Sequence, residues 1–329
     1  MGPNPLISVI MSVNRDDGNL TETINSILNQ TYQNYELIII NDGGSKDVRH
    51  TIKNYNNSRL KYYEKPKIGL TACLNYGVDK AKGEYIARQD AGDISLKNRL
   101  KTQINFFNNH PEISLIGSWV SELTEEGDHL GDIEFSKSYE NIKENIPFQN
   151  AFCHGTIMAL TTLFRDFNGY RDVFLKAQDY DLWLRIIEKY KVVNIGKVLY
   201  KRIVSRESIT IRTKKIQMEY ADVARKCFNA RLLGKEEPLH LLKKIKFNEN
   251  QINFSYQKID SDYYFYCGRI LFSNRKMNRS RIYFIRSIYH NPFKIIIIPY
   301  LVFSFLPTAI LDMLEKGWKC IQFKLKIQI

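Results

Sequence analysis

The chain has 329 residues, of which 44% are hydrophobic and 25% charged, and its formal net charge is +13. This length allows one large domain with an appendage or two smaller domains, and the composition excludes wholesale disorder, a collagen-like repeat and a heptad rod. All of the excess positive charge lies after residue 210. A domain boundary is therefore expected there, and the basic part favours an anionic membrane surface or a nucleic acid as its partner.

The first 210 residues alternate between short apolar runs and helical patterns. The expected strands are residues 7–13, 35–40, 59–64 and 84–88, and the expected helices are residues 19–30, 69–80 and 95–108, the last capped by Ser95. This alternation predicts βαβ units in an α/β fold with a mostly parallel sheet, covered by helices on both sides. Two acidic turns, Asp42 and Asp90–Asp93, follow expected strands, and ligands bind beyond the carboxyl ends of such strands.

Five segments in this order carry a family resemblance: Ile7–Val13, Ser26–Thr31, Glu36–Gly43, Gly83–Asp90 and Gln178–Arg185. Together they resemble the inverting glycosyltransferases of family 2, which have the GT-A fold, in the branch that builds bacterial and archaeal envelope glycans. The resemblance implies a GT-A nucleotide-sugar transferase domain at residues 1–210. The charge distribution and the helical patterns predict a basic helical domain at residues 211–329. A dinucleotide-binding dehydrogenase is excluded, because no GxGxxG motif follows the first strand.

The donor implied by the resemblance is a nucleotide-sugar, with a UDP-sugar expected first. Asp42 would accept a hydrogen bond from a uracil-like N–H, and Val13 would pack against the base. The further residues expected near the nucleotide are Asn14, Lys67, Asn75, Arg88 and Asp90. The family's usual aromatic residue is missing after Val13, where Asn14 stands, so the identity of the nucleotide stays open.

A divalent metal is expected as cofactor, since Mg²⁺ or Mn²⁺ stabilises a departing diphosphate and prefers aspartate oxygens. Asp90 matches the first member of the family's Asp-any-Asp motif, but Gly92 stands at the second. Three interpretations remain open: Asp93 takes over the metal, Asp90 holds it with help from water, or metal binding is weak. Alternatively, Asp93 only caps the helix expected near Ser95.

Inversion at the anomeric carbon needs a single displacement and therefore one base. Asp179 matches the base of the family. Residues two apart on a helix point roughly 200° apart, so only one of Asp179 and Asp181 faces the cleft. Asp181 precedes Arg185 by four residues, the spacing of a helical ion pair, which favours Asp181 as structural and Asp179 as the base. The alternative for Asp179 is an acid that stabilises the helix N-terminus through the dipole.

Three other residues are candidates for contacts with the acceptor or a phosphate: His154, Trp183 and Arg202. His154 lies in a segment that matches the family, and a structural histidine is its alternative.

The basic C-terminal third predicts helices at residues 213–233, 262–274 and 281–289. Residues 295–311 are uncharged, but Pro299 and Pro307 interrupt them, and a helix of that length would span only about 25 Å of a ~30 Å hydrocarbon core. With the lysines around it, the segment predicts an interfacial membrane anchor at about residues 293–326, and a buried hairpin is its alternative. We expect a peripheral protein at the cytoplasmic face of the membrane, acting on a glycan or polyprenyl-linked acceptor.

The basic charge and the departures from the family motifs suggest two rival functions. A nucleic-acid partner is not expected, because the basic region has no zinc-finger, RRM or basic-zipper signature. A non-catalytic scaffold of the same fold, binding a sugar nucleotide or glycan, remains the alternative and is motivated by Gly92, Gln178 and Val204.

Overall fold

The computed structural model describes residues 4–44, 46–206, 214–245, 256–311 and 313. The chain divides into two compact units. Unit 1 comprises Met1–Leu123, Asp132–Ile203 and Thr213–Phe247, whereas unit 2 comprises Thr124–Gly131, Val204–Arg212 and Asn248–Ile329. The contacts therefore group the first helix after residue 210 with the sheet of unit 1, a division that differs from the boundary expected from charge.

The N-terminal half of unit 1 is a parallel sheet with interleaved helices. Its elements are β1 (Ile7–Val13), α1 (Leu20–Leu28), β2 (Tyr35–Asp42), α2 (Lys46–Lys53), β3 (Leu60–Lys65), α3 (Leu70–Lys80) and β4 (Tyr85–Arg88). The strands lie in the order β3-β2-β1-β4. Val13 is opposite Asn41, and Ile10 is opposite Arg88, so the residues that follow β1, β2 and β4 come out at one edge of the sheet.

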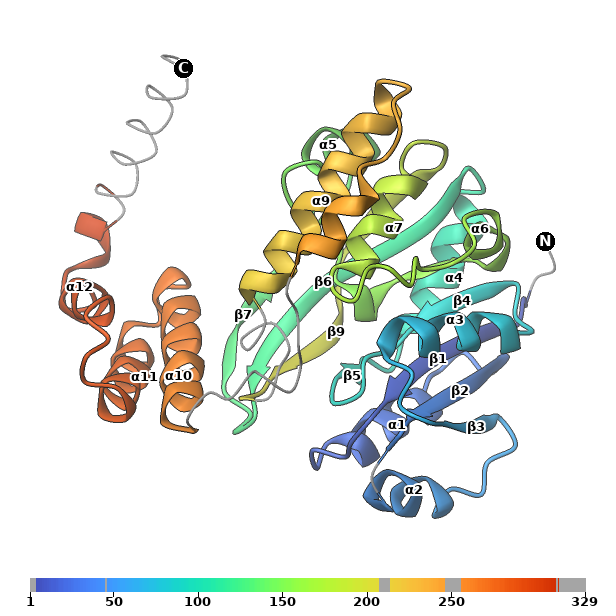
Figure 1. Cartoon of the computed structure of the whole chain (residues 1–329). Helices are drawn as coiled ribbons and strands as arrows, with labels where there is room; N and C mark the ends of the chain where they lie inside the picture. The colour runs from blue at the N-terminus through green and yellow to red at the C-terminus, as the bar shows by residue number, and fades with distance from the viewer. Residues whose placement is uncertain (1–3, 45, 207–213, 246–255, 312, 314–329) are drawn as a thin grey trace. The chain divides into compact units, whose positions relative to one another are not determined.

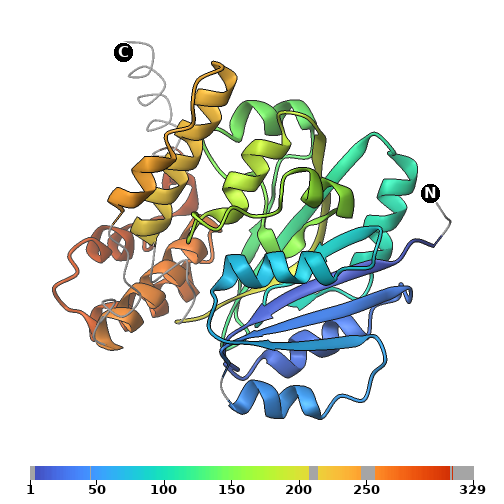
Figure 2. The ribbon, with the colours of Figure 1, turned by 45° about the vertical axis from the view of Figure 1, so that its right-hand side comes forward.

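Side chains alternate between the two faces of these strands. Ile10 packs on one face with residues of α3, whereas Val9 and Met11 pack on the other with residues of α1, α2 and α4 (Arg99–Asn109). Figures 1 and 2 show α3 on one side of the strands and α1 and α2 on the other. The near-continuous apolar runs of β1 and β2 thus reflect strands buried on both faces.

Four further strands extend the sheet in the order β8-β6-β9-β5 beyond β4. The elements are β5 (Ile94–Ser95), β6 (Ile113–Thr124), β7 (His129–Ile133), α5 (Tyr139–Asn145), the 3₁₀ turn η1 (His154–Thr156), β8 (Met158–Leu160), α6 (Thr161–Asp166), α7 (Gln178–Ile186), β9 (Lys191–Val204), α9 (Lys214–Leu232) and the 3₁₀ turn η2 (Leu239–Lys244). β8 runs antiparallel to β4 and β6, and β5 runs antiparallel to β9. The helix expected to begin at Ser95 begins at Arg99 instead, because Ser95 pairs with Tyr200 in the sheet.

Unit 2 contains the helices α10 (Tyr256–Ser273), α11 (Met277–His290) and α12 (Ile297–Phe303). Its buried cluster joins residues of α10 and α11 to Leu130 and Val204, which come from its other two segments. Tyr300 of α12 packs against Phe284 and Phe265. No helix within the described part of the chain is both long and apolar enough to cross a bilayer.

Candidate active site

Asp42 is the last residue of β2, and its side chain binds the backbone of the turn that precedes α3. Its carboxylate is almost fully buried, and Oδ1 accepts hydrogen bonds from the backbone N–H groups of Ile68 (2.7 Å) and Gly69 (3.0 Å). Gly43 follows with φ of 63°, and a Cβ there would lie only 2.8 Å from the Cβ of Lys67. A glycine is therefore required for the chain to turn away from β2 so close to the neighbouring loop.

The second acidic turn leaves the sheet at the end of β4. Arg88 is buried and donates from Nη1 to the carbonyl oxygen of Ile10 (3.0 Å) and from Nη2 to Asp90 Oδ1 (2.8 Å). The hydroxyl of Tyr200, on β9, accepts from the backbone N–H of Asp90 (3.1 Å). Asp90 is thus held from both sides, while its side chain keeps 37% of its surface exposed.

Asp93 lies in the same turn but is buried, with a different set of partners. Its Oδ1 accepts from the backbone N–H of Ile203 (2.8 Å). Burial, followed by the neighbouring charge of Asp90, raises the pKa of Asp93 well above that of a solvated aspartate. Since the next helix begins at Arg99 and not near Ser95, Asp93 does not have the helix-capping role that the sequence left open.

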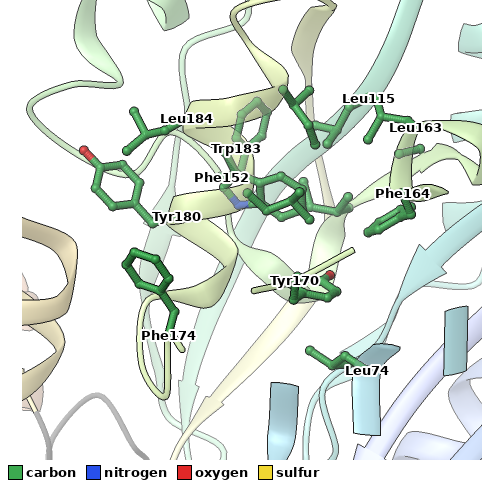
Figure 3. Packing of buried hydrophobic residues seen from close by; sticks show 14 of the residues in the cluster. Leu74, Leu115, Phe152, Leu163, Phe164, Tyr170, Phe174, Tyr180, Trp183 and Leu184 are labelled. Carbon is green, nitrogen blue, oxygen red and sulfur yellow. The ribbon is translucent and has the colours of Figure 1, made fainter. Parts of the chain in front are cut away.

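His154, which is half-buried, and its buried aromatic neighbours form one wall beside Asp90. His154 Nε2 lies 2.8 Å from the hydroxyl of Tyr170, and its ring contacts that of Trp183 at 5.9 Å between centroids. Figure 3 shows Trp183 packed beside Phe152 in this cluster. Burial, helped by the positive charge of Arg88, lowers the pKa of His154 to about 4, so the imidazole is neutral at pH 7 and can offer a phosphate or hydroxyl only hydrogen bonds.

Because residue 155 is a glycine, the backbone next to His154 can lie close to Asp90 and Tyr200. A Cβ at residue 155 would lie 2.3 Å from the Tyr200 hydroxyl and 2.9 Å from Asp90 Oδ2. Real Cβ atoms do not approach so closely, so any side chain here would push Asp90 or Tyr200 out of position.

Asp179 and Asp181 have different environments on α7, as their spacing predicts. Asp181 is 1% exposed and pairs with Arg185 through a 3.1 Å contact, and Arg171 also donates to it. Asp179 is partly exposed, and its Oδ2 accepts a hydrogen bond from Asn150 Nδ2 (3.1 Å). The expected ion pair of Asp181 is confirmed, and Asp179 is the more exposed of the two carboxylates in this helix turn.

Two of these aspartates, Asp90 and Asp179, affect the pKa values of the same two side chains. Asp90 and Asp179 both act on His154, raising its pKa against the larger effect of burial, and both act in the same direction on Tyr170. Asp42 is connected to this region through α3. The Thr71 hydroxyl donates to the carbonyl oxygen of Phe174 (3.2 Å), in the loop that leads to Asp179.

The other expected site residues lie in varied surroundings. Val13 is buried at the end of β1, and Asn14 after it is exposed. Asn75 Nδ2 donates to the carbonyl oxygen of Tyr170 (2.8 Å), so its amide braces the loop before α7. Arg202 pairs with the buried Glu122. Asn75 and Arg202 are therefore engaged within the protein in this structure.

The residues around the acidic turn fit a metal shared with a substrate. Among the described residues, no three His, Cys, Asp or Glu side chains gather into a metal-binding cluster. Magnesium is commonly held by one or two carboxylates together with substrate phosphates and water. Asp90, with its exposed carboxylate oxygen, suits that arrangement, whereas the buried Asp93 with its raised pKa is less suited to direct coordination.

Comparison with known proteins places this geometry in a family. The profile of glycosyl transferase family 2 matches residues 8–164. The O-antigen biosynthesis glycosyltransferase WbnJ of Escherichia coli is 36% identical over 187 residues, covering 56% of this chain and 72% of WbnJ. The chain belongs to glycosyl transferase family 2. An uncharacterised glycosyltransferase of Methanocaldococcus jannaschii, MJ1057, is a further relative, 33% identical over 219 residues that cover 64% of this chain and 75% of MJ1057.

Solved structures share the fold of this family 2 glycosyltransferase. TarS of S. aureus (residues 1–349, in complex with UDP) superposes with a TM-score of 0.51 at 16% identity, covering 86% of this chain and 88% of that one. The mannosyltransferase PcManGT from Pyrobaculum calidifontis, in complex with GDP-Man and Mn²⁺, gives 0.52 at 13% identity and covers 92% and 86% of the two chains. The expected GT-A class of α/β fold is confirmed.

Several residues that shape the site of this family 2 glycosyltransferase were not found from sequence. Tyr200 and Tyr170 contact Asp90 and His154 from more than ten residues away, and Asn150 reaches Asp179 across 29 residues. Arg99 lies within the helix expected at residues 95–108, and the sequence predicts no further role for it. It donates from Nη2 to the carbonyl oxygen of Arg88 (2.7 Å) and lies over the Tyr200 ring. The buried face of α4 also carries Gln103, whose Oε1 accepts a hydrogen bond from Arg99 Nε (3.2 Å).

Proposed function

We propose that this glycosyltransferase moves a sugar from a nucleotide-sugar, with inversion at the anomeric carbon, to a hydroxyl of a glycan or lipid-linked acceptor. The observation that carries the proposal is that Asp90 lies against Gly155, next to His154, while α7, the helix that carries Asp179, places Trp183 against the His154 ring. The Asp90 carboxylate would lie on the side of the donor's diphosphate, and the Asp179 carboxylate on the side of the acceptor. The test is a screen of nucleotide-sugars by release of nucleoside diphosphate with candidate acceptors.

Asp179 is the proposed base. As the acceptor oxygen bonds to the anomeric carbon, the bond from that carbon to the diphosphate oxygen breaks. The acceptor's proton passes to the Asp179 carboxylate. His154 and Trp183 line the adjoining wall, where His154 in its neutral form can orient a hydroxyl without competing for the proton.

On the donor side, Asp42 would accept from the base N–H, with Val13 beneath the base and Asn14 at its edge. The cation of Arg88 holds Asp90, and Lys67 and Asn75 lie along the strand edge and α3. A divalent metal bound with the diphosphate would supply charge stabilisation for the leaving group. Asp90 would hold it, and Asp93 would brace the turn through Ile203. TarS and PcManGT have been solved with UDP and with GDP-Man and Mn²⁺, which supports this class of donor and cofactor.

The biological setting proposed is synthesis of a cell-envelope polysaccharide or glycoconjugate, at the cytoplasmic face of the membrane. The O-antigen role in the name of WbnJ supports it. A non-catalytic scaffold that only binds the sugar nucleotide is the second candidate, favoured by Gly92 in the acidic turn. Binding of donor without any turnover, with every acceptor tried, would favour the scaffold.

Replacing Asp42 by Asn is expected to weaken binding of UDP about tenfold, the effect of losing one hydrogen bond to a charged group. The amide oxygen can still accept from Ile68 and Gly69, so the fold is kept while the acceptor for the base N–H becomes a donor. Titration calorimetry with UDP measures the change, and a melting temperature checks the fold. Unchanged affinity in a folded variant would contradict the role of Asp42.

The membrane proposal rests on the apolar surface of unit 2. Phe293 and Ile295 are 90% and 73% exposed, and further exposed apolar residues follow: Ile296, Ile298, Val302, Phe303, Phe305, Ile310 and Met313. Such a concentration of exposed apolar side chains on a basic unit suits the interface of an anionic bilayer. The lysines beyond residue 313 that completed the expected anchor lie outside the described residues.

Replacing both Phe293 and Ile295 by Glu is expected to weaken binding to anionic vesicles at least about tenfold, since two partly inserted side chains are lost. Co-sedimentation with phosphatidylglycerol vesicles measures the change. Leu233→Glu, at a 69% exposed apolar residue directly after α9, is the control and should bind as the wild type does. Failure of the wild-type chain to bind these vesicles would refute the anchor.

A further inference from the structure

Asn150 has an unusual position in the site, because both ends of its amide are used. Its Nδ2 donates to Asp179 Oδ2 (3.1 Å), and its Oδ1 accepts from the backbone N–H of Phe152 (3.2 Å). A carboxylate can only accept and a backbone N–H can only donate, so the two bonds are satisfied by a single orientation of the amide. The amide nitrogen is therefore turned toward Asp179.

The loop that carries Asn150 is fixed on both sides of it. Before it, the hydroxyl of Tyr180 donates to the carbonyl oxygen of Ile146 (2.5 Å), which ties the loop to α7 next to Asp179. After it, Asn194 of β9 donates to the carbonyl oxygen of Ala151 (3.0 Å). Asn150 itself is exposed, but its backbone is held by the same helix that carries Asp179 and by the sheet.

The two carboxylate oxygens of Asp179 therefore have different environments. Oδ2 is occupied by the amide, and no other hydrogen bond reaches this carboxylate from the described residues of the protein. Oδ1 is left for the proton of an acceptor hydroxyl. An amide donor suits this task because it restrains the carboxylate without carrying a proton-accepting group of its own.

We propose that Asn150 is a positioning residue for Asp179, which fixes the carboxylate so that Oδ1 faces the acceptor hydroxyl. The inference rests on the proposed function, in which Asp179 is the base. Asn150 acts on the proton-transfer step through Asp179 and leaves donor binding to other residues. Its loss therefore lowers kcat and changes the KM for the donor little.

Two substitutions separate this role from a purely structural one. Asn150→Asp keeps an oxygen that can accept from Phe152 and so preserves the turn, but it replaces the donor to Asp179 by a second carboxylate. Asn150→Ala loses both bonds. The matched control, Gln149→Asp, introduces the same charge one residue away on an exposed side chain.

Steady-state transfer assays on the full chain, with donor and acceptor varied in turn, give the test. We expect kcat to fall about tenfold in Asn150→Ala and about 100-fold in Asn150→Asp, in the range found when a reacting group is displaced. Donor KM should stay within about twofold, and Gln149→Asp should behave as the wild type. Near wild-type kcat in Asn150→Asp, with a larger loss in Asn150→Ala, would mean that the turn alone matters and would overturn the proposal.

The wild type and Asp179→Asn, assayed in parallel, test the proposed function separately. No transfer by the wild type, or full transfer by Asp179→Asn, would defeat the proposed function itself. Transfer by the wild type and none by Asp179→Asn, combined with an active Asn150→Asp, would defeat only the role of Asn150.

Discussion

Asp179→Asn is expected to lower kcat for sugar transfer at least about 1,000-fold, within the range that a general base contributes. The substitution keeps the size of the side chain and removes the group that takes the acceptor's proton. Affinity for the nucleotide should change less than about threefold, because the donor-binding residues lie on other elements. Transfer is measured by product formation, and nucleotide affinity by calorimetry.

A matched control for this variant is Glu140→Gln, which makes the same change of carboxylate to amide at an exposed residue of α5. It should transfer sugar at the wild-type rate. Should Asp179→Asn keep more than a tenth of the wild-type kcat, the base is a different residue, and the partly exposed position of Asp179 would reflect only its place in the first turn of α7.

Asp90→Asn is expected to lower transfer at least about 100-fold, as is typical when a group that stabilises developing charge is removed. The variant leaves the buried Arg88 without its 2.8 Å charged partner and removes the carboxylate best suited to a metal. The dependence of rate on added Mn²⁺ should therefore shift to higher metal concentration. Rates measured over a metal titration, with the donor held at saturation, give both effects.

Asp79→Asn provides the comparison, because Asp79 is an exposed carboxylate near the end of α3. Its metal dependence should be that of the wild type. A metal titration of Asp90→Asn that overlays the wild-type curve would exclude Asp90 as a metal ligand, and a rate above half that of the wild type would exclude it from the reaction.

The parallel part of the fold could be predicted closely from sequence. β1, β2 and β4 begin or end within about two residues of the expected bounds, because each is a largely apolar segment buried on both faces. The spacing of Asp181 and Arg185 likewise reported a true ion pair, since both residues lie on one helix. Local periodicity is sufficient to predict an interaction when the two residues lie on adjacent turns of one helix or on strands that are close in sequence.

The antiparallel part and much of the site depend on distant pairings that no local pattern contains. Serine is a common helix-capping residue, but Ser95 lies in strand β5 because it pairs with Tyr200, which is 105 residues later in the chain. Strand β9, which contains Tyr200, also contains Ile203, whose backbone N–H donates a hydrogen bond to Asp93. Sequence patterns therefore pointed to the candidate acids but not to the side chains and backbone groups that hydrogen-bond them.

The cluster of unit 2 has a consequence for dissecting the protein. Leu130 and Val204, completely or almost completely buried there, belong to segments far upstream of its helices. A fragment cut at residue 210, where the charge changes, would lack both side chains and present the apolar faces of Tyr263 and Leu271 to water. Such a fragment would be prone to aggregation, so the C-terminal third is best studied by point substitution within the intact chain.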